Sequence, residues 1–112
     1  MNHIQFSSPS RPIIAAGYYL DPSLKTLFLP DGRKVALTET EGRIMACLLI
    51  NVKRPVSRLD LSQNAFDENE AKEGRAIDVH ISRLRKKLGE YSYTLTSKYG
   101  KGYVINPPSI EE

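Results

Sequence analysis

The stretch GRAIDVHISRLRKKLG, residues 74–89, combines the spacing of an amphipathic helix with five Arg and Lys residues and one acid. At about 100° per residue, its large aliphatic side chains fall within one narrow stripe. That stripe consists of Ile77, Ile81, Leu84 and Leu88, and the opposite face carries Arg75, Val79, Ser82, Arg83 and Lys86. We therefore predict a helix over residues 74–88 that buries the stripe and leaves a cationic face for a partner.

The flanks of this helix carry a second set of polar residues. Asp78 and Arg85 lie on one flank, and His80 and Lys87 lie on the other. Asp78 and His80 point about 200° apart on a helix, which excludes them as a catalytic dyad. We expect Asp78 to pair with a nearby arginine, such as Arg85 or Arg75, and His80 to pack at the helix flank.

Positive charge is concentrated around this helix. The 112 residues carry a formal net charge of +3. Residues 72–101 contain eight basic and three acidic residues, a net charge of +5, so the remainder of the chain carries −2. This asymmetry indicates that one segment of the chain meets an anionic partner.

Short strand-like runs occupy the first third of the chain. AGYYLD, KTLFL and RKVAL, at 16–21, 25–29 and 33–37, are separated by the turn sequences DPS and PDG. Proline presets φ and glycine accepts positive φ, so both sequences favour tight turns. These runs predict an antiparallel meander of three strands.

Two helices should precede the cationic one. Thr38 and Glu41 form a capping box, which predicts a helix that begins near Glu39 and ends before Pro55. Ser57 is the expected N-cap of a second helix, with Leu59 and Leu61 facing inward. After the cationic helix, two β-prone runs around a glycine-containing turn predict a hairpin over residues 94–105. This order of elements is typical of a winged helix-turn-helix domain, in the α+β class.

The length is that of one domain, and its expected boundaries follow from composition. Residues 1–13 are expected to form a flexible tail or interdomain linker, 14–107 the winged-helix domain, and 108–112 a C-terminal tail. No apolar run is long enough to span a membrane, and one cysteine, Cys47, cannot form an internal disulfide. We therefore expect a cytoplasmic protein without enzymatic activity, cofactor or metal site, in which Cys47 is a small buried hydrophobe.

A basic helix followed by a basic hairpin favours nucleic acid as the partner. Lys98 and Lys101 surround the hairpin turn, and Tyr99 lies between them. Arginine and lysine neutralise phosphates or reach guanine edges, and a small apolar group can contact a thymine methyl. Two alternatives remain open at this point: a winged-helix module that binds an acidic protein surface, and a DNA-binding protein with little sequence preference.

The sequence resembles a known family over residues 16 to 105. RAIDVHISRLRKKLG, followed by TSKYGKGYVI, resembles the OmpR/PhoB-type winged-helix effector domain of bacterial response regulators. LTETEGRIMACLLIN resembles the first helix of that family, and PVSRLDL resembles its second. The resemblance implies a four-stranded N-terminal sheet, whose fourth strand we expect near PVS at residues 55–57, then three helices and a hairpin wing.

The resemblance also implies roles for individual residues. Residues 74–88 would be the recognition helix in the major groove of double-stranded DNA, and the wing at 94–105 would lie at the minor groove. The expected DNA-binding residues are Arg58, Arg75, Val79, Ser82, Arg83, Lys86, Lys87, Lys98, Tyr99 and Lys101. Asp67, Glu68 and Glu70 correspond to a loop that contacts RNA polymerase in activators of this family.

Departures from the family pattern and the short chain length qualify these roles. Tyr99 replaces an arginine that enters the minor groove in many members, and Phe66 replaces a tryptophan. The family implies binding to direct-repeat sites and an attached receiver domain, for which this chain has no room. We expect this chain to be such an effector domain, with residues 1–13 as its linker.

Overall fold

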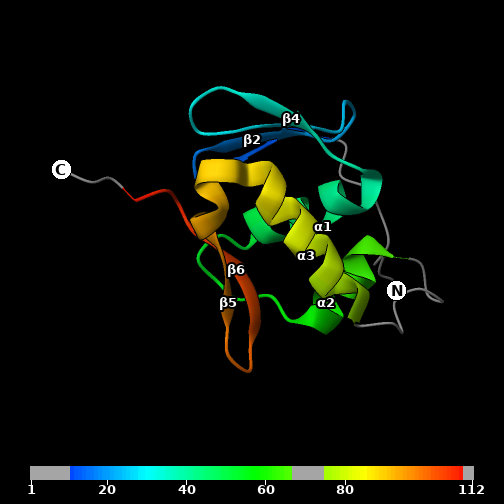
Figure 1. Ribbon diagram of the computed structural model, residues 1–112. Helices are drawn as coiled ribbons and strands as arrows, with labels where there is room; N and C mark the ends of the chain where they lie inside the picture. Colours follow the sequence, from blue (N-terminus) through cyan, green and yellow to red (C-terminus); the bar gives the residue numbers. More distant parts are fainter. Residues whose placement is uncertain (1–10, 67–74, 110–112) are drawn as a thin grey trace.

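The computed structural model describes residues 11–66 and 75–109, with only the backbone at Arg75 and Ala76. A four-stranded antiparallel sheet comes first, in the order β1-β2-β3-β4. Its strands are β1 (Ile13–Ala15), β2 (Tyr18–Asp21), β3 (Thr26–Phe28) and β4 (Lys34–Ala36). Three helices lie against one face of this sheet, and a hairpin extends beyond them (Figure 1). This arrangement confirms the predicted α+β winged-helix architecture.

The fourth strand of the sheet lies elsewhere than expected. It is β1, which begins at Ile13 and pairs Ile14 with Tyr19 of β2. The turn between them places Ala16 at φ 55° and Gly17 at φ 83°. Gly17 is a turn signal, but an alanine rarely adopts a positive φ, and both residues were assigned to the strand that follows. The expectation of a fourth strand near PVS was wrong, because Val56 instead forms a bridge with Tyr103 of the hairpin.

The first two helices begin at the predicted caps. Helix α1 (Glu39–Ile50) has the expected capping box, with Glu41 N–H donating to Thr38 Oγ1 at 3.1 Å and Thr38 N–H donating to Glu41 Oε1 at 2.9 Å. Helix α2 (Arg58–Ala65) begins after Ser57, whose hydroxyl accepts from the Asp60 N–H at 3.0 Å. Leu61 is buried, but Leu59 is 60% exposed, so the prediction that both face inward was wrong. Residues two apart on a helix point to nearly opposite sides.

Helix α3 (Arg75–Leu88) crosses the core and buries its predicted stripe. All four aliphatic residues of that stripe are essentially inaccessible to solvent: Ile77, Ile81, Leu84 and Leu88. They pack with Ile44 and Leu48 of α1 and Leu61 of α2 in one hydrophobic cluster. Removing apolar area from water contributes about 25 cal/mol per Å² to stability. Burial of this stripe therefore fixes the orientation of α3. The face of α3 opposite this stripe therefore points to solvent.

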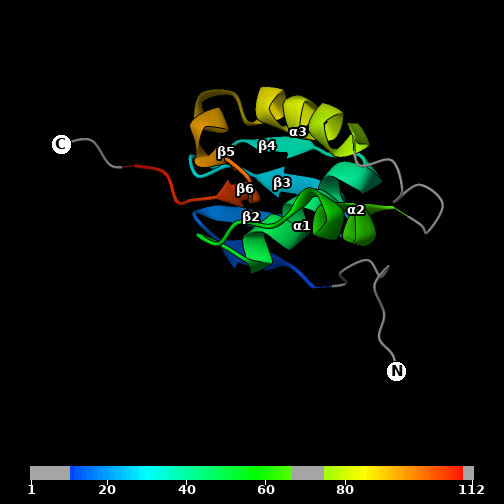
Figure 2. The same ribbon diagram turned by 90° about the horizontal axis from the view of Figure 1, so that it is seen from below.

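The hairpin forms the wing beside α3. A short 3₁₀ helix, η2 (Gly89–Thr94), leads from α3 into β5 (Leu95–Lys98), which pairs with β6 (Gly102–Ile105). Figure 2 shows α3 and the two wing strands from below. Reciprocal hydrogen bonds between Val56 and Tyr103, at 2.7 and 2.9 Å, attach β6 to the segment just before α2. This bridge holds β6 next to its first residue, so only the turn from Lys98 to Lys101 extends beyond the attached part of the wing.

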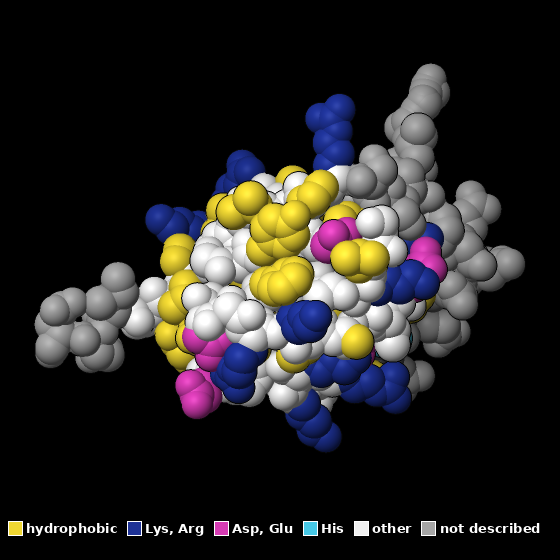
Figure 3. Space-filling view, turned by 90° about the horizontal axis from the view of Figure 1, so that it is seen from above, with side chains coloured by type: hydrophobic (Ala, Val, Ile, Leu, Met, Phe, Trp, Pro, Cys, Tyr) yellow, Lys and Arg dark blue, Asp and Glu magenta, His cyan; other side chains and the backbone are white. Residues whose placement is uncertain are grey.

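The outer face of the sheet is partly apolar. Register places Ile14, Tyr19 and Phe28 side by side across β1, β2 and β3. The rings of Tyr19 and Phe28 make an edge-on contact, with centroids 5.5 Å apart. Hydrophobic side chains gather on this face, with Lys and Arg around them (Figure 3). This face lies on the side of the molecule away from the wing.

Candidate nucleic-acid interface

The described part of the outward face of α3 is exposed and cationic, as predicted. Ser82, Arg83 and Lys86 are exposed, and Val79 is 49% exposed between them. Within the part of the chain that the structure describes, neither Arg83 nor Lys86 forms a salt bridge. Their charges are therefore available to an external anion. The side chain of Arg75, which was predicted to join this face, lies outside the described residues.

The wing tip brings a second set of exposed groups. Lys98, Tyr99 and Lys101 are all exposed, and the Tyr99 ring is fully accessible, at 103% of its reference area. The turn closes with Lys101 N–H donating to Lys98 carbonyl oxygen at 2.9 Å, and Gly100 adopts φ 73° within it. A fully accessible aromatic ring between two ammonium groups suits contact with a nucleic acid backbone or groove. The structure thus gives the wing the exposure that the predicted contacts require.

Asp78 connects α3 to both α2 and the wing. Its Oδ1 accepts a hydrogen bond from Arg58 Nε at 2.8 Å and another from the Tyr103 hydroxyl. The Arg58 guanidinium also lies over the Tyr103 ring, 5.5 Å from its centroid. The hydrogen bond from Arg58, and then that from Tyr103, holds the pKa of Asp78 below its usual value. The expected pairing of Asp78 with an arginine is confirmed, but the partner is Arg58 and not Arg85, which was named as an example.

Arg85 instead joins α3 to the wing. Its Nε donates to the Leu95 carbonyl oxygen at 2.8 Å, and its guanidinium lies 5.7 Å from the Tyr103 ring centroid. Arg58 was predicted to contact the DNA backbone, yet it already has an intramolecular partner in Asp78. That ion pair is about half exposed on both sides, so it restrains the two side chains and adds little stability. Arg58 therefore has an internal partner while its side chain stays about half exposed.

Lys87 was also predicted to bind DNA, and the structure gives its ammonium a different role. Its Nζ donates to Glu41 Oε1 at 2.6 Å and to the Ala36 carbonyl oxygen at 2.9 Å. Burial alone would raise the pKa of Glu41, which is 2% exposed, but hydrogen bonds from Lys87 and Thr38 outweigh it and lower that pKa. Lys87 thus ties α3 to α1 and β4, and its predicted contact with DNA stays a prediction.

His80 lies at the same flank of α3, as predicted. Its ring packs against Phe66, with centroids 5.6 Å apart. Burial, followed by the nearby charge of Arg83, lowers the pKa of His80, so the imidazole is neutral at pH 7. Its Nδ1 is buried and has no hydrogen-bond partner among the residues that the structure describes. Asp78 and His80 therefore lie on separate flanks and share no site.

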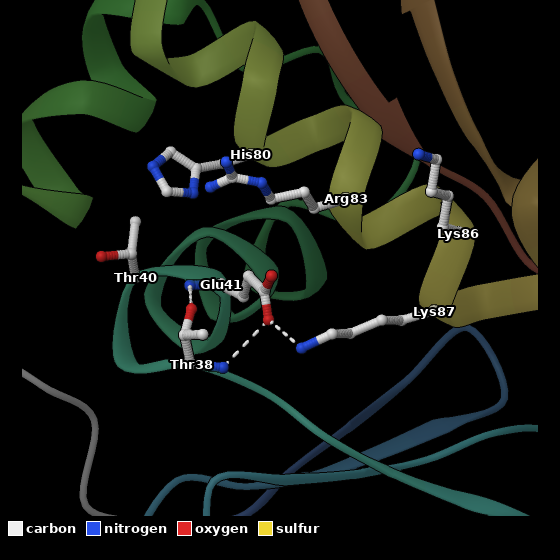
Figure 4. A pocket seen from close by; sticks show the side chains of 7 residues that line it. All are labelled: Thr38, Thr40, Glu41, His80, Arg83, Lys86 and Lys87. Atoms are coloured by element: carbon white, nitrogen blue, oxygen red, sulfur yellow. Dashed lines mark hydrogen bonds and ion pairs between the residues drawn. The ribbon is translucent and has the colours of Figure 1, made fainter.

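A hollow opens between α3 and the first turn of α1, with a volume of about 590 Å³. Figure 4 shows the side chains that line it. They are Thr38, Thr40, Glu41, His80, Arg83, Lys86 and Lys87. Sequence reasoning missed Thr38 and Thr40 as members of this surface. The capping box marked these residues as the start of a helix. No local signal in the sequence predicts which face of α3 packs beside that start.

Membrane-spanning helices and metal sites are both absent from the described parts of the chain, 11–66 and 75–109. No helix there has the length and apolar content that crossing a bilayer requires. No group of three or more His, Cys, Asp or Glu side chains in those ranges is arranged to hold a metal ion. The loop with Asp67, Glu68 and Glu70, predicted to contact RNA polymerase, falls outside these ranges.

Comparison with known proteins places this chain among transcriptional regulatory proteins. Residues 32–105 match the family described as "Transcriptional regulatory protein, C terminal". The transcriptional regulatory protein TctD of Salmonella typhimurium is 37% identical over 78 residues, which cover 70% of this chain and 35% of TctD. This chain therefore spans about a third of the length of that relative.

The fold of this chain is also similar to solved structures of DNA-binding domains. The DNA binding domain of CpxR from E. coli superposes with a TM-score of 0.68 and 27% identity, covering 89% of this chain and all of that domain. The RstA DNA-binding domain of Klebsiella pneumoniae, solved in complex with the RstA box, gives a TM-score of 0.67 and 27% identity over 88% of this chain and 99% of that one. With the family match over residues 32–105, the buried stripe of α3 and the wing beside it, this chain belongs to the family of C-terminal domains of transcriptional regulatory proteins.

Proposed function

We propose that this chain binds double-stranded DNA sequence-specifically, as the effector domain of a bacterial transcriptional regulator. In this proposal α3 lies in the major groove and the wing at the adjacent minor groove. The observation that carries it is the outward face of α3, where exposed Arg83 and Lys86 have no ion pair with a described residue. The RstA relative, solved on its DNA box, supports the same partner for this chain.

The chemistry of the α3 face suits a major groove. That groove is about 12 Å wide and admits one helix, whose exposed residues then meet base edges. Val79 is an exposed apolar group that can contact a thymine methyl, and Ser82 can hydrogen-bond a base or a phosphate. Lys86 can reach a guanine edge or a phosphate. Val79 and Ser82 are therefore the best candidates for base readout.

The wing contributes a different kind of contact. Lys98 and Lys101 are exposed lysines, which bind phosphates without reading the sequence. Tyr99 replaces the arginine expected at the minor groove, and its ring can pack against the sugar and phosphate backbone. The wing should thus raise affinity for all duplexes, while α3 selects among them.

Selection of randomised duplexes by the purified chain tests this proposal. We expect an enriched motif, and we expect Val79→Ala or Ser82→Ala to change one position of that motif. Lys98→Ala should instead weaken binding on all duplexes alike and reduce the slope of log K against log salt by about 0.9. Lys34→Ala removes the same charge from β4, on the outer sheet face, and is the matched control.

Two outcomes would favour the alternatives left open by the sequence. Binding without an enriched motif would indicate a DNA-binding protein with little sequence preference. No binding to any duplex would favour the protein-interaction module.

The remaining expectations concern the longer protein. We propose that the domain acts in the cytoplasm at direct-repeat sites, with an attached receiver domain, and that Asp67, Glu68 and Glu70 contact RNA polymerase. The resemblance to response regulators supports these expectations. Cross-linking to polymerase of a full-length protein with these three acids replaced by alanine would test the last of them.

A further inference from the structure

Contacts near both ends of one flank of α3 join this helix to the wing. Near the start of α3, Asp78 Oδ1 accepts a hydrogen bond from the Tyr103 hydroxyl of β6. Near the end of α3, Arg85 Nε donates to the Leu95 carbonyl oxygen of β5 at 2.8 Å. Asp78 and Arg85 are two helical turns apart, which places them on the same side of α3 and about 10 Å apart along its axis. A single contact would leave α3 free to pivot, whereas two contacts at this separation fix its direction relative to the wing.

The side chains that we propose to read bases lie between these two contacts. Val79 and Ser82 stand between them along α3, and both are exposed. Their position against base edges therefore depends on the direction of α3 that the two contacts set. Lys98 and Lys101, at the wing tip, extend from the strands that make the same contacts.

Tyr103 is itself held from several directions. Its backbone forms the reciprocal bridge with Val56. The guanidinium carbons of Arg58 and Arg85 lie 5.5 and 5.7 Å from its ring centroid. Burial, followed by the hydrogen bond to Asp78, raises the pKa of Tyr103, so its hydroxyl keeps the proton and remains a donor. The hydroxyl thus reaches Asp78 from a ring that is fixed to β6.

Helix α2 contacts the same carboxylate. It lies beside the first turns of α3 (Figure 1), and Arg58 Nε donates to Asp78 Oδ1 at 2.8 Å. Loss of the Tyr103 hydroxyl would therefore leave Asp78 charged and still paired with Arg58. The contact between the wing and α3 can thus be removed without leaving the carboxylate unpaired.

We propose that Tyr103 is a positioning residue for sequence readout, whose hydroxyl fixes the direction of α3 relative to the wing through Asp78 before DNA is bound. The inference rests on the proposed function. A prepositioned helix lets α3 and the wing engage one duplex without a further loss of conformational freedom. Hydrogen bonds to bases weaken steeply when their geometry is poor, whereas phosphate contacts carry no sequence information. Tyr103 should therefore control selectivity more than affinity for DNA in general.

Tyr103→Phe removes the hydroxyl and keeps the ring and the backbone bridge. We expect affinity for the selected duplex to fall about tenfold, which corresponds to about 1.4 kcal/mol. Affinity for a scrambled duplex should change by less than about twofold, because non-specific binding relies on phosphate contacts. A merely structural role would lower the folded fraction and reduce both affinities by the same factor. The ratio of the two affinities therefore separates positioning from stability.

Tyr93→Phe is the matched control. Tyr93 lies in η2, and its hydroxyl accepts from the Ser109 N–H at 3.2 Å, so this variant loses a tyrosine hydroxyl whose hydrogen bond does not involve α3. We expect its affinity ratio to equal that of the unmodified chain. Urea denaturation of both variants checks that they are folded at the temperature of the binding assay.

Asp78→Asn changes the other partner of the same contact. The amide keeps the shape of the carboxylate and loses the charge that binds Arg58 and Tyr103. Binding to scrambled duplexes should strengthen because a negative charge is removed, while the selected duplex gains less, so the affinity ratio falls. Asp31→Asn, which breaks the comparable ion pair with Arg33 at 2.7 Å in the turn between β3 and β4, removes the same charge and is the control. In the double variant, Tyr103→Phe with Asp78→Asn, the two decreases in ratio should be less than multiplicative, because both act through one hydrogen bond.

The proposal is overturned if Tyr103→Phe keeps the affinity ratio of Tyr93→Phe, or if it lowers both affinities equally. Decreases in ratio that multiply in full in the double variant would also overturn it. Each of these results can occur while the unmodified chain selects a motif, and the positioning role then fails alone. If the unmodified chain selects no motif, the proposed function is rejected and the positioning role with it.

Discussion

Replacement of Gly102 by alanine should detach the wing from the rest of the domain. Gly102 begins β6 at φ 122°, a region that side chains rarely adopt. A Cβ at this position would lie 2.0 Å from the Val56 carbonyl oxygen and 2.8 Å from the Ser57 Cα. Both are backbone atoms, so no rotation of a side chain can relieve the overlap. The bridge between Val56 and Tyr103 has to open.

The loss of unfolding free energy in the Gly102→Ala variant follows from the contacts that the variant loses. The bridge consists of two hydrogen bonds, Val56 N–H to Tyr103 oxygen at 2.7 Å and Tyr103 N–H to Val56 oxygen at 2.9 Å. Each contributes about 1 kcal/mol net, and a non-glycine residue at such a φ costs about 1–3 kcal/mol. We therefore expect the Gly102→Ala variant to lose about 3–5 kcal/mol of unfolding free energy, a large part of the total for a domain of this size.

Urea denaturation measures this loss, and Gly100 provides the control. Gly100 also has a positive φ, 73°, but a Cβ there would meet no atom within 4 Å. Gly100→Ala should cost only the conformational term, about 1–2 kcal/mol. In the Gly102→Ala variant, hydrogen exchange at the Tyr103 amide should also accelerate. Equal losses for the two variants, within about 0.5 kcal/mol, would refute the reasoning that close backbone contact at Gly102 anchors the wing.

The remaining predictions concern titratable groups. Glu41→Gln should cost about 2–3 kcal/mol at pH 7, because it removes the charge that a part-buried lysine faces. Since the pKa of Glu41 is lowered by folding, its contribution is present above pH 4.5 and is lost as the pH falls through the folded value, so the two proteins should converge in acid. Burial raises the pKa of Cys47 to about 11 from 9.0, so at pH 8 the folded thiol should react with iodoacetamide about 100-fold more slowly than in urea. Arg58→Ala and Tyr103→Phe should both raise the pKa of Asp78, the first by more, as followed by carbon-13 NMR.

Each of these three has a contrary outcome. A constant stability difference between wild type and Glu41→Gln from pH 7 to pH 3 would mean that the carboxylate charge is not what stabilises the contact. Equal alkylation rates for Cys47 in folded and unfolded protein would show an accessible thiol. A larger shift of the Asp78 pKa in Tyr103→Phe than in Arg58→Ala would reverse the order of its two partners.

Local signals in the sequence were enough to define most of the elements. The capping box at Thr38 and the N-cap at Ser57 act within one helical turn, and both helices begin there. The aliphatic stripe of α3 follows from periodicity alone, and burial of that stripe forces the face with Arg83 and Lys86 outward. The strand β1 escaped notice because Ala16 and Gly17, which form its turn at positive φ, were assigned to the next strand.

Only the tertiary structure decided which side chains pair with one another. The sequence could place Asp78 and Lys87 on the flanks of one helix. Helical periodicity gives only the direction of each side chain, and the residue that it meets comes from another part of the chain. Packing brought Arg58 to Asp78 and Glu41 to Lys87, so two cations predicted to bind DNA acquired internal partners. The hollow beside Arg83 has the same origin, since it exists only where two helices meet. Periodicity along one helix determines which residues point outward, whereas the packing of helices determines which of those residues remain available.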